Sequence, residues 1–130
     1  MPVVNELPQK HESLTLLWEN PRPNTALNSG YQTALSDPTA FDKIRVIWQF
    51  GTSSDGNEIQ VDYMPINNGS ISGEVWTWSI SEVLRADTAV FARRITVPNN
   101  LQFWIDNCTR VGSSGNYNSY VMPLRIYGVK

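Results

Sequence analysis

The segment that most constrains the fold is residues 43–50, which have the sequence KIRVIWQF. Apolar side chains occupy every second position of this segment, namely Ile44, Val46, Trp48 and Phe50. Successive side chains point to opposite faces of a β-strand, so this alternation predicts a central strand with one buried face. Ile47 falls on the opposite face and predicts that this face is partly covered as well.

Further segments have the length or the alternation of strands, and turn residues such as Asn, Gly and Pro separate them. They are residues 13–18, 31–35, 58–65, 74–80, 88–97, 101–108 and 120–129. Residues 81–86 are compatible with a single helical turn. Many short strands without a long helix are typical of antiparallel sandwiches and barrels. The sequence therefore predicts an all-β fold, an antiparallel two-sheet sandwich that is jelly-roll-like and has about eight strands.

The N-terminal residues differ in composition from the rest of the chain. Residues 1–12 are polar, contain two prolines and show no periodicity, which predicts an N-terminal arm or tether. The whole chain has 130 residues, a length at which one domain buries about two thirds of its unfolded surface. We therefore expect residues 13–130 to form a single β-sandwich domain.

A proline-rich segment, NPRP, follows the first predicted strand and its Trp18. Residues that precede proline favour extended backbone, so this segment is predicted to be stiff, with Trp18 anchoring its base. Trp18, Pro21 and Pro23 are therefore expected to be structural residues, and so is Trp48 of the central strand.

Arg93 and Arg94 are neighbours on one predicted strand and must therefore lie on opposite faces of it. One of the two has to point towards the core or an interface. An inward arginine needs a carboxylate or several carbonyl groups as partners. We predict a structural role for both residues, with contact to a ligand as the alternative.

The composition excludes several classes of partner. Charged residues make up 17% of the chain, the net charge is −2, and no run of Lys or Arg exceeds two residues. Binding to nucleic acid relies on clusters of Lys and Arg that neutralise phosphates, and the sequence shows no such cluster, so we expect no nucleic-acid partner. Neither a signal peptide nor an apolar run of membrane-spanning length is present, so we expect no membrane insertion.

The residues needed for common catalytic and metal sites are scarce. His11 is the single histidine and lies in the predicted arm, while Cys108 is the single cysteine. A nucleophilic site needs a base fixed inside the domain, and zinc prefers several nitrogen or sulfur ligands. We therefore predict no enzyme, no catalytic residue, no metal and no cofactor. Because the chain has twelve acidic residues, their number alone does not exclude the pair of carboxylates that a glycosidase uses. Each of these residues is nevertheless expected to be a solvated acid.

Two features are candidates for a binding surface. Trp76 and Trp78 share one face of a predicted strand and form either part of the core or a flat platform for sugar rings. The loop at residues 116–120 alternates tyrosines with small polar residues, a mixture that binding loops use, although a plain hairpin loop has the same composition. The candidate ligand-binding residues are Asn116, Tyr117, Asn118, Tyr120 and Trp104.

Three motifs carry a resemblance to a known group of proteins. They are LLWENPRPNTAL at residues 16–27, FARR at residues 91–94 and MPLRIYGVK at residues 122–130. Their order and spacing resemble small bacteriophage tail-fibre and minor structural proteins. Those proteins open with Leu-Trp-x-Asn-Pro-x-Pro, carry a Phe/Tyr-x-Arg-Arg middle and end with Ile-Tyr-Gly-Ile-Lys. Val129 replaces the isoleucine, and Leu27 stands where the family often has an aromatic or other bulky residue.

The resemblance implies a non-enzymatic virion component, often the head of a host-adsorption fibre and often a symmetric trimer. We therefore expect a receptor-binding head domain that attaches to a bacterial surface saccharide. The expected partners are other copies of the chain and other virion proteins, after synthesis in the host cytoplasm without a signal peptide. The alternatives are a stand-alone carbohydrate-binding module that uses Trp76, Trp78 or Trp104, and a capsid decoration protein.

Overall fold

The computed structural model describes residues 12–51, 58–64, 79–86 and 89–130. Most of the predicted arm with His11, and both Trp76 and Trp78 of the strand predicted at residues 74–80, lie outside these residues. In the described part, no helix is long and apolar enough to cross a membrane.

The described residues form nine β-strands and one short 3-10 helix. The strands are β1 (Leu14–Glu19), β2 (Gly30–Thr33), β3 (Lys43–Gly51), β4 (Glu58–Tyr63), β5 (Ser79–Ala86), β6 (Ala89–Thr96), β7 (Gln102–Ile105), β8 (Thr109–Arg110) and β9 (Tyr120–Val129). The 3-10 helix η1 (Pro38–Ala40) precedes β3, and the Asp37 side chain caps it by accepting a hydrogen bond from the Thr39 amide.

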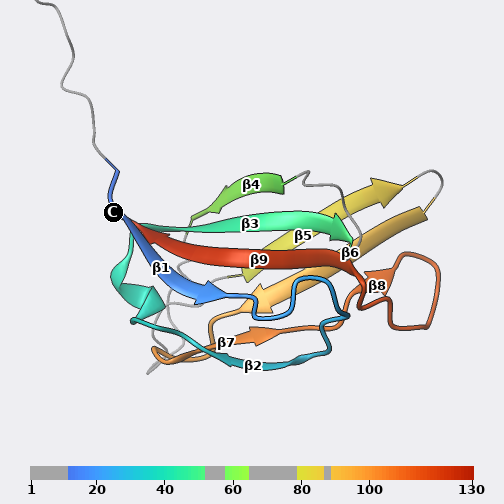
Figure 1. The fold of residues 1–130 in the computed structure, drawn as a ribbon, viewed down its shortest axis with the longest axis horizontal. Coiled ribbons are helices and arrows are strands. Elements are labelled where there is room, and N and C mark those ends of the chain that lie inside the picture. Colours follow the sequence, from blue (N-terminus) through green and yellow to red (C-terminus); the bar gives the residue numbers. More distant parts are fainter. Residues whose placement is uncertain (1–11, 52–57, 65–78, 87–88) are drawn as a thin grey trace, which may run out of the picture.

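The strands pair into two antiparallel sheets that face each other (Figure 1). The first has the order β1-β9-β3-β4 and is called the β9 sheet below. The second has the order β2-β7-β6-β5, with β8 also paired to β6, and is called the β6 sheet. The chain crosses from the β9 sheet at β1 to the β6 sheet at β2 and returns to the β9 sheet at β3. The last strand, β9, lies between β1 and β3. The prediction of an all-β, antiparallel two-sheet sandwich is therefore confirmed.

Two element predictions differ from the structure. The helical turn expected at residues 81–86 is wrong, because β5 pairs with β6 from Ser79 to Ala86. The strand expected at residues 101–108 ends at Ile105, and a separate two-residue strand, β8, follows it. This break in the strand shapes the site described below.

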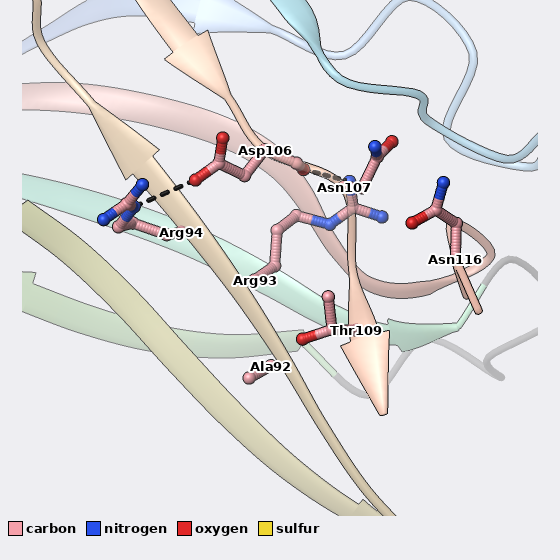
Figure 2. Close-up of a pocket in the computed structure, with 7 residues that line it drawn as sticks. All are labelled: Ala92, Arg93, Arg94, Asp106, Asn107, Thr109 and Asn116. Carbon is pink, nitrogen blue, oxygen red and sulfur yellow. Dashed lines mark hydrogen bonds and ion pairs between the residues drawn. The ribbon is translucent and has the colours of Figure 1, made fainter. Parts of the chain in front are cut away.

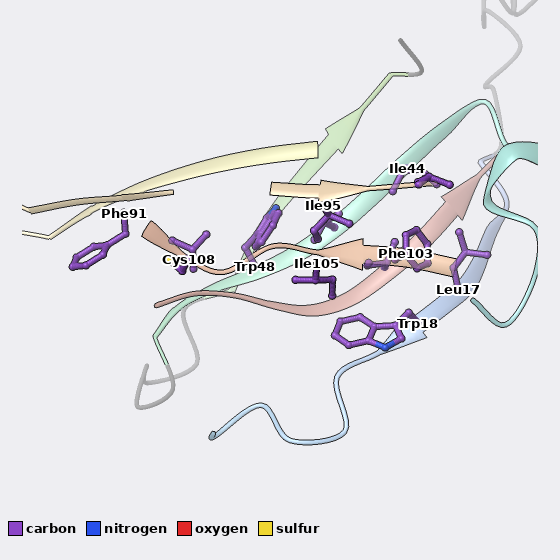
Figure 3. Close-up of a cluster of buried hydrophobic side chains, with 13 residues drawn as sticks. Leu17, Trp18, Ile44, Trp48, Phe91, Ile95, Phe103, Ile105 and Cys108 are labelled. Atoms are coloured by element: carbon purple, nitrogen blue, oxygen red, sulfur yellow. The ribbon is translucent and has the colours of Figure 1, made fainter. Parts of the chain in front are cut away.

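The core lies between the two sheets and confirms the face predicted from β3 (Figure 3). Ile44, Val46 and Trp48 are fully buried, and the Trp48 indole nitrogen donates a hydrogen bond of 2.8 Å to the Tyr63 hydroxyl. Ile47 on the other face is only 8% exposed, so that face is covered as well. From the β6 sheet the core receives Phe91, Ile95, Phe103 and Ile105, together with Cys108 after β7.

The proline-rich segment begins where β1 leaves its neighbour β9. The Asn20 amide nitrogens bond to this central strand at two points, the backbone one to the Leu124 carbonyl and the side-chain one to the Pro123 carbonyl. Pro123 lies within β9 and has no N–H group to donate to a neighbouring strand. The pairing of β9 with β3 shifts register next to Pro123. Trp18 is buried and donates to the Gln32 side chain of the opposite sheet, while Pro21 is exposed and Pro23 is half-buried.

Four charged side chains form a network on the outer face of the β9 sheet. Arg45 binds Asp62 through two hydrogen bonds of 2.6 and 2.9 Å. Lys43 Nζ lies 3.0 Å from Asp62 Oδ2 and 2.7 Å from Glu12 Oε1, and Arg45 also reaches Glu12 at 2.9 Å. The last residue of the predicted arm is therefore held against β3 by two cations.

This network predicts a loss of stability in acid. Hydrogen bonding from Arg45 lowers the pKa of Asp62 from 3.8 to about 2. A carboxyl whose pKa is lowered by folding stabilises the protein above its unfolded pKa and loses that contribution as the pH falls to the folded pKa. Asp62→Asn is expected to lower the free energy of unfolding at pH 7 by about 1 kcal/mol.

Urea unfolding at pH 7 and at pH 2.5 checks this expectation. The difference between wild type and Asp62→Asn is expected to shrink as the pH falls from about 4 towards 2. A difference that stays constant over this range would show that Asp62 does not supply the pH-dependent term.

Candidate functional site

The two partners of β6 leave a gap between them along the strand. β6 pairs with β7 at Ile95 and Thr96 and with β8 at Phe91 and Ala92. Between these pairs one backbone hydrogen bond of 2.9 Å, from the Asp106 amide to the Arg94 carbonyl, bridges the strands. A pocket of about 370 Å³, called the β6 pocket below, lies at this gap (Figure 2). Its lining residues are Ala92, Arg93, Arg94, Asp106, Asn107, Thr109 and Asn116.

Arg93 points inward from β6 and is only 2% exposed. All five of its N–H donors bond to backbone carbonyls. The acceptors are Val121 at 2.8 Å, Leu27 and Asp106 at 2.9 Å, and Asn118 and Tyr120 at 3.0 Å. Burial lowers the pKa of Arg93 to about 10, so the guanidinium is charged at neutral pH. Arg93 therefore ties three loops together beside the β6 pocket.

Arg94 points outward from the next position of β6. Its Nε atom donates a hydrogen bond of 2.9 Å to Asp106 Oδ2, and its side chain is 59% exposed. The other carboxylate oxygen of Asp106 accepts a hydrogen bond from the Trp104 indole nitrogen. Asp106 therefore links a charged group and an aromatic group on the outer face of the β6 sheet.

Tyr31 and Trp104 form an aromatic pair on this same outer face. They are direct neighbours in the register between β2 and β7, and Trp104 in turn lies opposite Thr96 of β6. The two ring centroids are 4.7 Å apart with an interplanar angle of 65°, and Tyr31 is 60% exposed. An exposed aromatic surface thus adjoins the polar β6 pocket through the contact between Trp104 and Asp106.

Asn118, a predicted ligand-binding residue, uses its side chain inside the protein. Its Oδ1 atom accepts a hydrogen bond of 2.8 Å from the Cys108 amide. Its Nδ2 atom donates to the Oδ1 atoms of Asn107 at 2.8 Å and Asn28 at 3.1 Å. These contacts join the loop before β9 to the loop after β7.

The tyrosines of the same loop pack against Phe91. The Tyr120 ring stacks on Phe91 with a centroid distance of 4.2 Å and an interplanar angle of 11°. The Tyr117 ring meets Phe91 edge-on at 5.6 Å, and its hydroxyl lies 2.7 Å from Ser113 Oγ. Phe50 of β3 contacts both Phe91 and Tyr120, so the cluster closes this end of the sandwich.

The structure thus divides the five predicted ligand-binding residues into two groups. Asn116 lines the β6 pocket and Trp104 borders it, whereas Tyr117, Asn118 and Tyr120 are engaged in internal contacts. The sequence patterns did not identify Tyr31, Asp106 and Asn107 as candidate ligand-binding residues. The alternation of residues 101–106 places Trp104 and Asp106 on one face, but the pairing of Tyr31 with Trp104 needs the register of β2 against β7.

A second, smaller pocket of about 200 Å³ lies on the opposite side of the sandwich, at the β9 sheet. An ion pair of 2.8 Å between Arg125 and Glu58 crosses its lining. The remaining lining residues are Glu19, Asn20, Pro23, Asn24, Gln49 and Leu124. The described residues of this lining are mainly polar and include no aromatic side chain.

The chemistry available in the β6 pocket is that of hydrogen bonding and charge. Asp106 is the one carboxylate among the described lining residues, and two guanidiniums, two amides and a hydroxyl accompany it. Within the described ranges, no three side chains of His, Cys, Asp or Glu gather in a way that could hold a metal ion. The pocket can therefore bind a polar ligand through donors and acceptors.

The chain matches no protein-family model, no curated protein and no solved structure. Its function is inferred below from its own residues, from their geometry and from the motifs at residues 16–27, 91–94 and 122–130.

Proposed function

We propose that this chain is a non-enzymatic bacteriophage structural protein, the head domain of a tail fibre, which attaches to a saccharide on the bacterial surface. The observation that carries the binding part of the proposal is the outer face of the β6 sheet. There the pair of exposed Tyr31 and half-buried Trp104 adjoins a pocket lined by charged, amide and hydroxyl groups.

A sugar ring presents apolar C–H groups on its faces and hydroxyl groups around its edge. Aromatic side chains offer a large rigid apolar surface for such a face. Planar amide, carboxylate and guanidinium groups donate to or accept from the hydroxyls and fix the orientation. Trp104 supplies the first kind of contact, and Asn107, Asn116 and Asp106 supply the second within one small region.

The phage setting is supported by the three motifs and by the roles of their residues. Trp18 and Asn20 join β1 to the rest of the sandwich, Arg93 ties the loops together, and residues 122–129 form most of the central strand β9. Tyr31, Trp104, Asn107 and Asn116 lie outside all three motifs, whereas Ala92, Arg93 and Arg94 of the pocket lining belong to the FARR motif. The motifs therefore supply most of the scaffold and one wall of the binding pocket. The proposal includes a homotrimer that contacts other virion proteins.

Trp104→Ala and Tyr31→Ala are expected to weaken binding to bacterial surface polysaccharides about tenfold each, because each removes part of the aromatic surface. An array of such polysaccharides measures the affinity, and thermal unfolding checks that the variants fold. Met64→Ala is the matched control, since Met64 is exposed at the end of β4 on the other sheet. Affinity that survives both aromatic replacements would contradict binding at this face.

A stand-alone carbohydrate-binding module would use the same surface, so the oligomeric state separates the two functions. Light scattering on the full chain is expected to give the mass of a trimer. A strict monomer at high concentration that still binds the array would favour the module over the fibre head.

A further inference from the structure

We propose that the saccharide bound at the β6 pocket is acidic and that its carboxylate or phosphate group binds Arg94. This inference rests on the proposed function, because it names the class of saccharide that the same site takes. It follows from the balance of charge in the pocket, the free donors of Arg94 and the position of the aromatic pair.

The described side chains that line the β6 pocket carry two positive charges, from Arg93 and Arg94, and one negative charge, from Asp106. Among the described residues, the hydrogen-bond partners of Arg93 are backbone carbonyls and the Met122 sulfur, none of them a carboxylate. The two oxygens of Asp106 accept hydrogen bonds from Arg94 and Trp104. The described lining therefore has a net positive charge, although the whole chain carries −2. An anionic ligand group is favoured there.

Arg94 keeps donors available for such a group. Among the residues that the structure describes, its one side-chain partner is Asp106, reached through Nε, and the side chain is 59% exposed. Neither terminal amino group of the guanidinium has a hydrogen-bond partner among the described residues. Two parallel N–H donors of a guanidinium match the two oxygens of a carboxylate or phosphate.

The aromatic pair lies at a suitable distance from Arg94. Trp104 is paired with Thr96, and Arg94 lies two positions from Thr96 on the same face of β6. Residues two positions apart on a strand are separated by about 7 Å. A sugar ring on Trp104 can therefore direct a charged substituent towards Arg94 while its hydroxyls meet Asn107 or Asn116.

An array of bacterial surface polysaccharides, each in a native and a neutralised form, tests this inference. Uronate-containing members are carboxyl-reduced, and members with glycerol phosphate groups are dephosphorylated. The wild-type chain is expected to bind native acidic members about tenfold more tightly than their neutralised forms, because a charge-assisted hydrogen bond is lost. The arm that loses binding identifies the group as carboxylate or phosphate.

Arg94→Gln assigns the preference to this residue. The variant is expected to bind acidic members about tenfold more weakly and neutralised members about as well as the wild type. Arg125→Gln is the matched control, because Arg125 is also an exposed-face arginine in an ion pair but lies on the β9 sheet. Raising the salt concentration is expected to remove the preference for acidic members.

The outcomes separate this inference from the proposed function. Equal binding of native and neutralised polysaccharides, with sensitivity to Trp104→Ala, would overturn the acidic ligand and leave saccharide binding in place. An equal effect of Arg94→Gln and Arg125→Gln would overturn the role of Arg94. Binding to no polysaccharide on the array would overturn the proposed function itself.

Discussion

Arg93→Met is expected to lower the free energy of unfolding by about 4 kcal/mol, the largest effect of any single replacement considered for this chain. Methionine fills a similar volume but donates no hydrogen bond, so five carbonyls each lose the hydrogen bond from Arg93, although the Asn118 carbonyl keeps the one from the Leu27 amide. Those carbonyls belong to the backbone and cannot be replaced together with Arg93. Urea unfolding followed by tryptophan fluorescence measures the loss.

Two further variants test whether the loss of stability comes from the hydrogen-bond donors of Arg93 or from any replacement of an arginine on β6. Arg93→Lys keeps the charge but has three donors in place of five, so a loss of about 2 kcal/mol is expected. Arg94→Met removes an exposed ion pair from the neighbouring position and is expected to cost less than about 1 kcal/mol. Equal losses for Arg93→Met and Arg94→Met would contradict the role assigned to Arg93.

The contact between Arg93 and Val121 also explains an unusual backbone conformation. Val121 is a buried β-branched residue with a φ of 49°, in the left-handed region that such residues rarely adopt. Its carbonyl accepts a hydrogen bond of 2.8 Å from Arg93 Nε. A conformation of this kind persists where surrounding contacts fix it, and the Arg93 bonds at residues 118, 120 and 121 do so.

Asn118→Ala is expected to lower the free energy of unfolding by about 2 to 3 kcal/mol, the second largest effect. The replacement leaves the Cys108 amide without its acceptor and removes both hydrogen bonds to the Asn28 and Asn107 side chains. The loop before β9 then loses its side-chain link to the loop after β7. Urea unfolding measures this effect as well.

Asn116→Ala is the matched control, because Asn116 lies two positions earlier in the same loop and is exposed. Its replacement is expected to change the stability by less than about 0.5 kcal/mol while weakening saccharide binding. If Asn118 instead served mainly as a ligand contact, Asn118→Ala would leave the stability unchanged and reduce binding. That result would return Asn118 to the binding surface.

The sequence predicted correctly which face of a strand a side chain occupies, because this depends only on the position of the residue within that strand. The alternation at residues 43–50 predicted the buried face of β3, because one strand with one buried face has a period of two. The same rule required Arg93 and Arg94 to lie on opposite faces, as they do. It could not name the partners of Arg93, because these come from loops near residues 27, 106 and 120.

Other features depended on contacts that no local pattern contains. Residues 81–86 have no alternation strong enough to exclude a helical turn, and their conformation is set by pairing with β6 along the whole of β5. Asn118 lies in a loop whose composition is typical of binding loops. Only the fold brings Asn28, Asn107 and Cys108 to its side chain. Candidate site residues that share a loop can therefore have different roles.

The most direct test of the central claim is a map of amide and indole chemical shifts of the full chain during titration with an acidic oligosaccharide released from an array-bound polysaccharide. We expect the changes to concentrate at Tyr31, Arg94, Trp104, Asn107 and Asn116, on the outer face of the β6 sheet. Changes centred on Gln49 and Arg125 at the β9 sheet, or no change at saturating ligand, would contradict the account.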